Sequence, residues 1–256
     1  MNFTHLILSI EERIAILKLN RPKALNALNR EMIKELNEAI EWLDENKDVR
    51  VVIITGQGEK SFVAGADISE FMNFNKDQGR RLSLDGHNLL FNKIASSKKP
   101  YIAAINGFAL GGGLELAMAC HVRIGSSSAR MGLPESSLGV IPGYGGTQRL
   151  IQLIGKGRAL EMMFSAKMID SETAEKYGFL NSVCGPESLM EEAIKMAKSF
   201  IKNSGDAQAA IIRVVNTTTE GGTGFNAEIK EFGDRFGSAE FAEGTSAFME
   251  KRKPTF

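Results

Sequence analysis

The chain has 256 residues, and 31 Lys and Arg residues balance 31 Asp and Glu residues, so its formal net charge at pH 7 is zero. A chain of this length buries roughly three quarters of its extended surface on folding, so it needs no metal, disulfide or lipid to stay folded. The charge balance removes the usual electrostatic argument for binding nucleic acid or an acidic membrane surface, and leaves another protein or a small molecule as the expected partner.

Two kinds of apolar pattern alternate along the first two-thirds of the chain. Short runs rich in Ile and Val predict strands, and apolar side chains at helical spacing predict helices. In chain order the patterns predict a strand at Arg13–Leu19, a helix at Arg30–Asn46, a strand at Arg50–Thr55, a helix at about Asp77–Ala95, a strand at Tyr101–Ile105, a helix at Gly112–Cys120, a strand at His121–Ile124, a helix at Glu172–Tyr177 and a strand at Phe179–Val183. This alternation favours an α/β fold.

The pattern changes at about Pro186, after which only helices are predicted. They cover Glu187–Lys202, Asp206–Thr219, Phe225–Phe236 and Ala239–Lys251, with glycines between them at Gly205, Gly221, Gly222 and Gly237. We expect an α/β core over residues 1–195 and a helical segment over residues 196–256. Such a segment is often an oligomerisation or lid element, although a continuation of the same domain explains the pattern equally well.

Cysteine usage and the N-terminal segment bear on the cell compartment. Only Cys120 and Cys184 are present, both in apolar sequence, so we expect small core side chains rather than a disulfide or metal ligands. The segment Met1–Leu19 lacks the basic start and the cleavage site of a signal peptide. The most apolar window, Tyr101–Cys120, contains three consecutive glycines and Glu115, which argues against a membrane span. We therefore expect a cytoplasmic protein.

Two glutamates stand alone in apolar, Gly-rich sequence. Glu115 is the only charged residue in Tyr101–Cys120, and Glu135 is the only one between Arg130 and Arg149. A buried carboxylate without a partner is destabilising by several kcal/mol or takes up a proton. An acid in the first turn of a helix, stabilised by the helix dipole, is the alternative for both residues. Together, the two isolated acids are typical of a general acid/base pair.

Two Gly-rich runs could supply backbone N–H groups to an oxyanion. The run Asn106–Leu116 leads from a predicted strand into a helix, so the N–H groups near Gly112 and Gly113 lie at the positive end of the helix dipole. The run Phe62–Ile68 has small residues followed by Asp67, although a tight strand-to-helix turn also explains it. Neither run has the spacing of a dinucleotide fingerprint or a phosphate loop.

The sequence shows no motif for a histidine metal site or a serine nucleophile. His5, His87 and His121 have no metal-ligand spacing, so we expect them to be structural or at the surface. No Gly-x-Ser-x-Gly motif for a serine nucleophile occurs. Carboxylates and backbone amides remain as the candidate chemistry, with no metal.

Five segments, taken in order, resemble the crotonase family, also called the enoyl-CoA hydratase/isomerase family. They are Asn20–Leu28, Phe62–Glu70, Asn106–Cys120, Leu133–Leu150 and Ala247–Phe256. One departure is His121, because many relatives carry Asp after the cysteine. The resemblance implies a spiral of ββα units, with the C-terminal segment, residues 196–256, forming trimers that pair into hexamers.

The resemblance also implies a ligand and roles for individual residues. The ligand is an acyl-CoA thioester, so coenzyme A belongs to the substrate and no separate cofactor is implied. The N–H groups of Ala66 and Gly112 would form the oxyanion hole, and Glu115 and Glu135 would hold the reacting water. The CoA channel would be lined by Lys23, Ala24, Leu25, Ala27, Ala64, Asp67 and Ile68. Phe248 and Lys251 would reach the adenine end, from a neighbouring subunit.

Retention of both acids favours an enoyl-CoA hydratase, which adds water to trans-2-enoyl-CoA in a reversible syn hydration. An isomerase or a branched-chain acyl-CoA hydratase of the same family is the nearest alternative. An RNA-binding moonlighting protein is an alternative of another class, against which the neutral charge balance argues. A catalytically inactive scaffold of the same fold is the third, and the intact acids argue against it.

Overall fold

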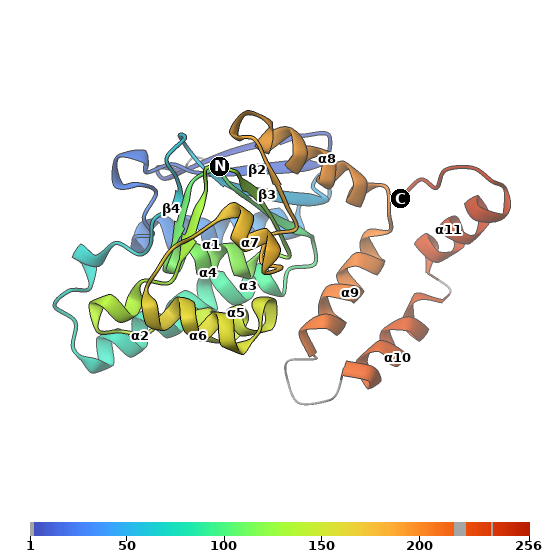
Figure 1. Cartoon of the computed structure of the whole chain (residues 1–256). Coiled ribbons are helices and arrows are strands. Elements are labelled where there is room, and N and C mark those ends of the chain that lie inside the picture. Colours follow the sequence, from blue (N-terminus) through green and yellow to red (C-terminus); the bar gives the residue numbers. More distant parts are fainter. Residues whose placement is uncertain (1–2, 218–223, 237) are drawn as a thin grey trace.

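The computed structural model describes residues 3–217, 224–236 and 238–256. The predicted positions of Thr218, Thr219, Gly221, Gly222 and Gly237 lie outside these residues. Among the described residues, strands form one six-stranded and one four-stranded sheet, and helices surround them (Figure 1). No helix in these ranges is both long and apolar enough to cross a bilayer.

The six-stranded sheet is parallel except at one edge. Its order is β1 (Leu6–Glu11), β2 (Ile14–Leu19), β3 (Val51–Gly56), β5 (Tyr101–Ile105), β7 (Val122–Ser126) and β10 (Ser182–Cys184). Only the β1–β2 pair is antiparallel. Every residue of β3 and β5 is buried, as expected for parallel strands covered on both faces, and this explains their continuous apolar runs.

The four-stranded sheet consists of very short strands. Its order is β4 (Ser61–Val63), β6 (Phe108–Leu110), β8 (Arg130–Gly132) and β9 (Ile169–Asp170). Each of β4, β6 and β8 follows a strand of the larger sheet and leads into helical structure, so the chain repeats a ββα unit. The expected α/β spiral is therefore confirmed. The sequence did not reveal this second sheet, because two or three residues are too few to show an apolar period.

Helices cover the sheets and complete the core. In chain order they are α1 (Arg30–Glu45), α2 (Lys76–Gly86), a π-helical turn (His87–Phe91), α3 (Asn92–Ala95), α4 (Gly112–Ala119), α5 (Gly146–Ile154), α6 (Lys156–Ser165), α7 (Ser171–Lys176) and α8 (Leu189–Ile201). The N-terminus of α1 is capped by the Asn29 side chain, which accepts from the Met32 N–H, and its apolar face is buried. Helices α5 and α6 had not been predicted from the sequence.

The C-terminal helices continue beyond this core. They are α9 (Gly205–Thr217), α10 (Gly224–Arg235) and α11 (Ala239–Met249), and Figure 1 shows them extending to one side of the sheets. The predicted boundary between residues 195 and 196 falls inside α8. Because Ala193 and Ala197 of α8 both belong to the apolar cluster against the six-stranded sheet, α8 is part of the core. We call α9 to α11 the arm.

Candidate active site

The N-terminus of α4 is held tightly against the second sheet. Gly111, at the end of β6, has φ 51° and donates its N–H to the carbonyl of Gly132 on β8. Gly112 then opens the helix, so its N–H has no acceptor within the helix. A Cβ on Gly113 would lie 2.0 Å from the Val63 carbonyl oxygen of β4, so only glycine allows this approach. The glycines thus set where the helix begins.

Ala66 presents a second free N–H group beside this helix. Leu28 and Ala66 form an isolated parallel bridge, in which the Leu28 N–H donates to Gly65 and the Leu28 carbonyl accepts from Asp67. The Ala66 N–H points away from this bridge, because successive amides of an extended segment alternate in direction. In the described part of the chain neither Ala66 nor Gly112 donates its N–H to another backbone group. Both N–H groups are thus available to an anion.

Glu115 is buried, with 1% of its surface exposed, in the first turn of α4. Its Oε1 accepts the N–H groups of Tyr144 and Gly146, each at 2.7 Å. Burial raises the pKa of Glu115 to about 7, the two N–H donors oppose this rise, and the charge of Glu135 adds to it. This carboxyl therefore titrates near neutral pH, as suits a group that exchanges protons.

Glu135 opens a short 3-10 helix, Glu135–Leu138, directly after β8. A Cβ on Gly111 would lie 2.8 Å from its Oε1, so the carboxylate lies over the turn that starts α4. Its Oε2 is buried and has no hydrogen-bond partner in the described part of the chain, and burial raises the pKa of this carboxyl too. The predicted acids are thus brought together, each with a carboxyl held above its ordinary pKa.

Three further residues at this site had escaped the sequence reasoning. Tyr144 and Gly146 provide the N–H donors to Glu115, and Arg149 of α5 also lowers the pKa of Glu115 through its charge. Helix α4 itself contains no Lys or Arg, and Arg149 approaches Glu115 from α5. The glycine-rich turn before α5 is the sequence feature that could have indicated these residues, because it is typical of a helix N-terminus close to another part of the backbone.

Two of the seven residues expected at the CoA channel line a cavity. Lys23 and Leu25 line this cavity, which has a volume of about 500 Å³. The neighbouring segment is tied to it, since the Ala64 N–H donates to the Leu25 carbonyl at 3.1 Å. Ala24 also lies in this segment. Arg21 connects two of the remaining predicted residues, because it donates to the Ala27 carbonyl at 2.6 Å and to the Asp67 carboxylate at 3.0 Å. Ile68 follows Asp67 in the sequence.

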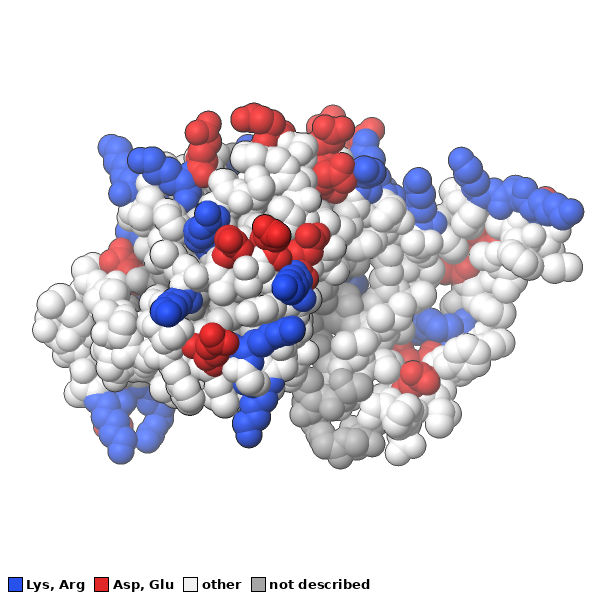
Figure 2. Space-filling view, viewed as in Figure 1, with Lys and Arg blue, Asp and Glu red and all other residues white. Residues whose placement is uncertain are grey.

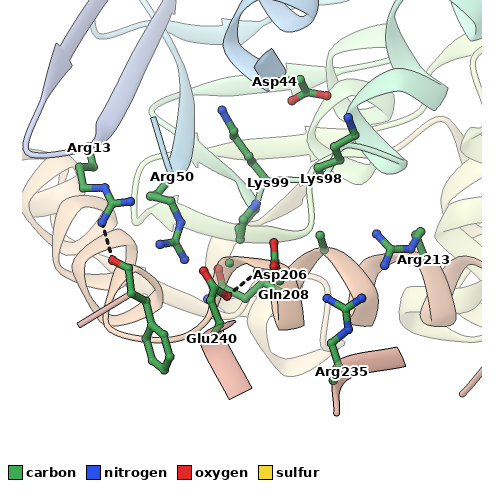
Figure 3. A pocket seen from close by; sticks show the side chains of 14 residues that line it. Arg13, Asp44, Arg50, Lys98, Lys99, Asp206, Gln208, Arg213, Arg235 and Glu240 are labelled. Carbon is green, nitrogen blue, oxygen red and sulfur yellow. Dashed lines mark hydrogen bonds between the residues drawn. The ribbon is translucent and has the colours of Figure 1, made fainter. Parts of the chain in front are cut away.

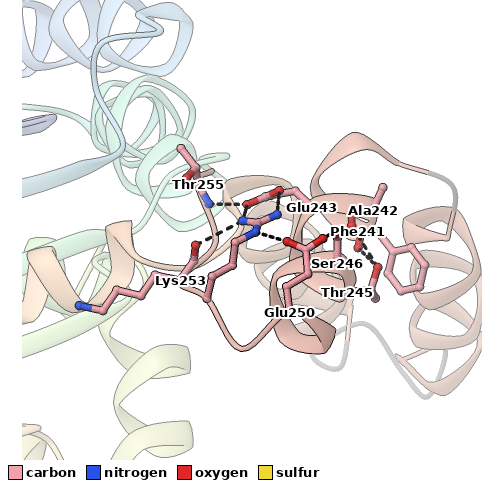
Figure 4. A network of polar contacts seen from close by, with 9 residues as sticks. Phe241, Ala242, Glu243, Thr245, Ser246, Glu250, Lys253 and Thr255 are labelled. Carbon is pink, nitrogen blue, oxygen red and sulfur yellow. Dashed lines mark hydrogen bonds and ion pairs between the residues drawn. The ribbon is translucent and has the colours of Figure 1, made fainter.

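Phe248 and Lys251 are not brought to this cavity within the chain. Phe248 lies in the last turn of α11 and Lys251 in the turn after it, and Figure 1 shows α11 on the far side of the molecule from β4 and α2. Phe248 is 81% exposed. The turn that follows α11 is held by Arg252, whose guanidinium binds Glu243 at 2.6 and 2.9 Å and Glu250 at 2.6 Å (Figure 4). Both residues are thus presented outward at the end of the arm.

A second cavity, of about 470 Å³, lies where the arm joins the core (Figure 3). Charged side chains line it, but its cations have partners within the chain. Arg13 donates to the carbonyl oxygen of Phe256 at 2.9 Å, and Arg50 donates to that of Asn203 at 2.8 Å. We interpret the hydrogen bonds around this cavity as contacts that hold the arm to the core.

In the ranges that the structure describes, no histidine or cysteine hydrogen-bonds to the two acids, although the His87 Cε1 lies 3.5 Å from a Cβ built on Gly145, in the turn before α5. His121 is half-buried and its Nδ1 accepts the Tyr101 N–H at 2.9 Å, and Cys120 and Cys184 are free thiols. Among the described residues, the only group with metal-ligating potential is His5 with Glu31 and Glu35. The His5 Nδ1 lies 3.8 and 3.7 Å from their carboxylates, which is also the arrangement of an ion pair with protonated His5.

Two neighbouring carboxyls with raised pKa values, close to two free N–H groups, form a site suited to acid/base chemistry. Residues 9–256 match the family described as Enoyl-CoA hydratase/isomerase, and the chain belongs to this family. It is 43% identical to the short-chain-enoyl-CoA hydratase of Clostridium acetobutylicum, over 99% of this chain and 97% of that protein. It is 41% identical to the crotonyl-CoA hydratase of Syntrophomonas wolfei, over 100% and 99%.

Solved structures show the same fold. The enoyl-CoA hydratase of Bacillus anthracis superimposes with a TM-score of 0.94 at 35% identity, covering 99% of both chains. An enoyl-CoA hydratase subunit of Geobacillus kaustophilus superimposes with a TM-score of 0.93 at 40% identity, covering 99% of this chain and 98% of that one. The crotonase fold class expected from the sequence is thus confirmed over the whole chain, arm included.

Proposed function

We propose that the protein is an enoyl-CoA hydratase that adds water reversibly across the C2=C3 bond of a trans-2-enoyl-CoA and yields the 3-hydroxyacyl-CoA. The observation that carries this proposal is the placement of Glu115 and Glu135 beside the free N–H groups of Ala66 and Gly112. Family membership and the printed names of the most similar relatives support the same reaction.

The N–H groups of Ala66 and Gly112 bind the thioester oxygen. Addition of water to C3 shifts electrons through C2 toward this oxygen, so its negative charge grows in the transition state. Fixed donors then stabilise the transition state more than the ground state. The dipole of α4 adds to this effect because Gly112 is its first residue.

The two carboxyls bind and activate the water. As the water oxygen bonds to C3, the water passes a proton to the ionised carboxylate, and the protonated carboxyl gives its proton to C2. The two acids have then exchanged protonation states, and transfer of one proton between them restores the starting state. The two acids need unequal protonation for this relay, which their different hydrogen bonding supports: Glu115 accepts two N–H groups, whereas the Glu135 Oε2 accepts none. The addition needs neither a metal nor a redox cofactor.

The rest of the substrate and the assembly follow from the resemblance. Coenzyme A lies along Lys23, Ala24, Leu25, Ala27, Ala64, Asp67 and Ile68, and the cavity beside Lys23 and Leu25 supports this placement. Phe248 and Lys251 reach the adenine end of a neighbouring subunit's substrate, which their outward position supports. The chain assembles into a trimer or a dimer of trimers through residues 196–256, and acts in the cytoplasm.

The test follows the loss of enoyl-thioester absorbance with crotonyl-CoA. Glu115→Gln and Glu135→Gln each keep a polar side chain of the same shape but remove the proton-exchanging group, so we expect kcat to fall by about 10² to 10⁴. Glu38→Gln, which removes an exposed carboxylate from α1, is the matched control. Near-normal turnover in either active-site variant would contradict the two-acid mechanism, and an inactive but folded wild type would contradict the hydratase assignment.

A further inference from the structure

Tyr144 has two separate relations to the proposed active site. Its backbone N–H holds Glu115, as described above, whereas its side chain has no part in that bond. The ring nevertheless lies inside the molecule, with only 6% of the residue exposed. A large aromatic ring directly beside a reacting centre fills space that a substrate could otherwise occupy.

The ring of Tyr144 is fixed on three sides. One edge meets α2, because a Cβ on Gly86 would lie 2.3 Å from Cε1 of the ring. The opposite edge meets the start of α4, because a Cβ on Gly112 would lie 3.4 Å from Cδ2. One face stacks on Phe91, with ring centroids 4.7 Å apart and planes 12° from parallel. The ring therefore bridges the gap between α2 and the oxyanion donor.

The surroundings of the ring are shaped to accept it. Gly86 ends α2 and Phe91 ends the π-helical turn that follows, so one short segment provides both contacts. A π-turn of this kind is uncommon and is frequent at functional sites. Any side chain at Gly86 would clash with the ring atoms, so glycine there and tyrosine at residue 144 are complementary.

The position of the ring relative to the donors indicates which part of a substrate it meets. Leu28 and Tyr144 both lie beside Gly112, at 3.6 and 3.4 Å from a Cβ built there. Leu28 continues the segment of Lys23 and Leu25, where we place coenzyme A. With the thioester oxygen on the Gly112 N–H, we place the CoA portion toward the segment that carries Leu28. The acyl chain then lies on the side of Glu115, whose carboxyl is held by the backbone of Tyr144.

We propose that the Tyr144 ring closes the acyl end of the active site and restricts the enzyme to short-chain enoyl-CoA substrates. This inference rests on the proposed hydratase function and names its substrate class. A chain that extends beyond the reacting carbons by more than a few methylenes meets the ring, which is held between Gly86, Phe91 and Gly112 and cannot swing aside without losing these contacts.

The test is a chain-length profile of kcat/KM with crotonyl-, hexenoyl-, octenoyl- and decenoyl-CoA. We expect the wild type to fall steeply with length. Tyr144→Ala should raise the decenoyl to crotonyl ratio at least tenfold, because each newly buried methylene favours binding by about fourfold. Tyr144→Phe keeps the ring and should keep the wild-type ratio. A wild type equally active on all lengths, or an unchanged ratio in Tyr144→Ala, would overturn the proposal.

A binding measurement separates this inference from the proposed function. Calorimetric titration with butyryl-CoA and decanoyl-CoA needs no turnover, and Tyr144→Ala should gain affinity for decanoyl-CoA at least tenfold relative to butyryl-CoA. Chain-length selectivity in binding without hydration would leave the inference standing and remove the hydratase function. Hydration activity with no effect of Tyr144→Ala on chain-length selectivity would leave the hydratase function standing and overturn the inference. Should Tyr144→Ala fail to fold, Tyr144→Leu serves as the second variant, with the same expected direction.

Discussion

At the scale of single residues, Glu115 shows how local sequence and tertiary surroundings combine. The sequence predicts an isolated acid in a helical first turn, and the structure confirms that position. Its environment comes from elsewhere in the chain: the donors from Tyr144 and Gly146 lie 29 and 31 residues away. Burial outweighs these donors, because the carboxyl keeps a pKa near 7 in spite of them.

The raised pKa of Glu115 makes stability depend on pH. Between its ordinary value of 4.5 and about 7, the folded chain keeps a proton that the unfolded chain has lost, so stability falls as pH rises through this window. Glu115→Gln has no carboxyl to titrate, so its stability does not fall in this window. Its Oε1 can still accept the two N–H groups. We expect the free energy of unfolding of the variant, relative to that of wild type, to be about 2 kcal/mol higher at pH 8 than at pH 5.

Urea unfolding at the two pH values and one protein concentration measures this gain. The control is again Glu38→Gln, which reports the effect of losing an exposed carboxylate. A difference between Glu115→Gln and wild type that stays constant with pH would show that the carboxyl is charged throughout this window.

At the scale of elements, the start of α4 depends on glycine while the interior of α2 does not. Gly113→Ala would place a Cβ 2.0 Å from the Val63 carbonyl oxygen, whereas a Cβ on Gly79 has no atom within 4 Å. We expect Gly113→Ala to lose at least about 1 to 3 kcal/mol through overpacking. Gly79→Ala should gain about 0.5 to 1 kcal/mol, because alanine restricts the unfolded chain and favours a helix.

Denaturant midpoints of the two variants and of wild type measure this opposite response. Shifts of the same sign would mean that α4 can move away from β4, and the tight approach at Gly113 would then not hold the oxyanion donors in place. Crotonyl-CoA turnover gives a second readout, since Gly113→Ala should also reduce kcat by displacing the Gly112 N–H.

The elements that could be predicted are those with a pronounced apolar pattern. Strands β2, β3 and β5 and helices α1 and α4 match the predicted positions within a residue or two, because each shows a continuous apolar run or a helical period. The four short strands that build the second sheet were missed. Yet these strands carry Ala66, Gly112 and Glu135 to one place, so the pattern identified the site residues without the elements that position them.

At the scale of the whole molecule, the arm has an apolar surface that the described residues leave exposed. Phe236, between α10 and α11, contacts Phe232 of α10 and Phe241 of α11, with ring centroids 5.1 and 4.7 Å apart, and all three side chains remain exposed. Phe225 and Ile229 are more exposed still. On the face seen in Figure 2, Lys and Arg are interspersed with Asp and Glu over the core. An apolar arm beside a mixed-charge core favours an interface between subunits.

We therefore expect Phe232→Asp to shift the assembly toward single chains, because a charge in an apolar interface loses its hydration. Light scattering coupled to size exclusion measures the mass, at matched protein concentration. Lys34→Asp on α1 is the control for an added acid on an exposed helix. An unchanged mass in Phe232→Asp, or a wild type that is already a single chain, would contradict the oligomerisation role of residues 196–256.

The sequence by itself determined the family, the α/β class, the two isolated acids and the glycines that free the N–H groups of one helix. These features are local, since burial pattern, helix period and glycine spacing act over a few neighbouring residues. Only the tertiary structure decided that Tyr144 and Gly146 hold Glu115, that Arg149 lies near it, and that the Tyr144 ring is locked between Gly86 and Gly112. Those contacts depend on how distant segments pack, and close packing has no period along the chain.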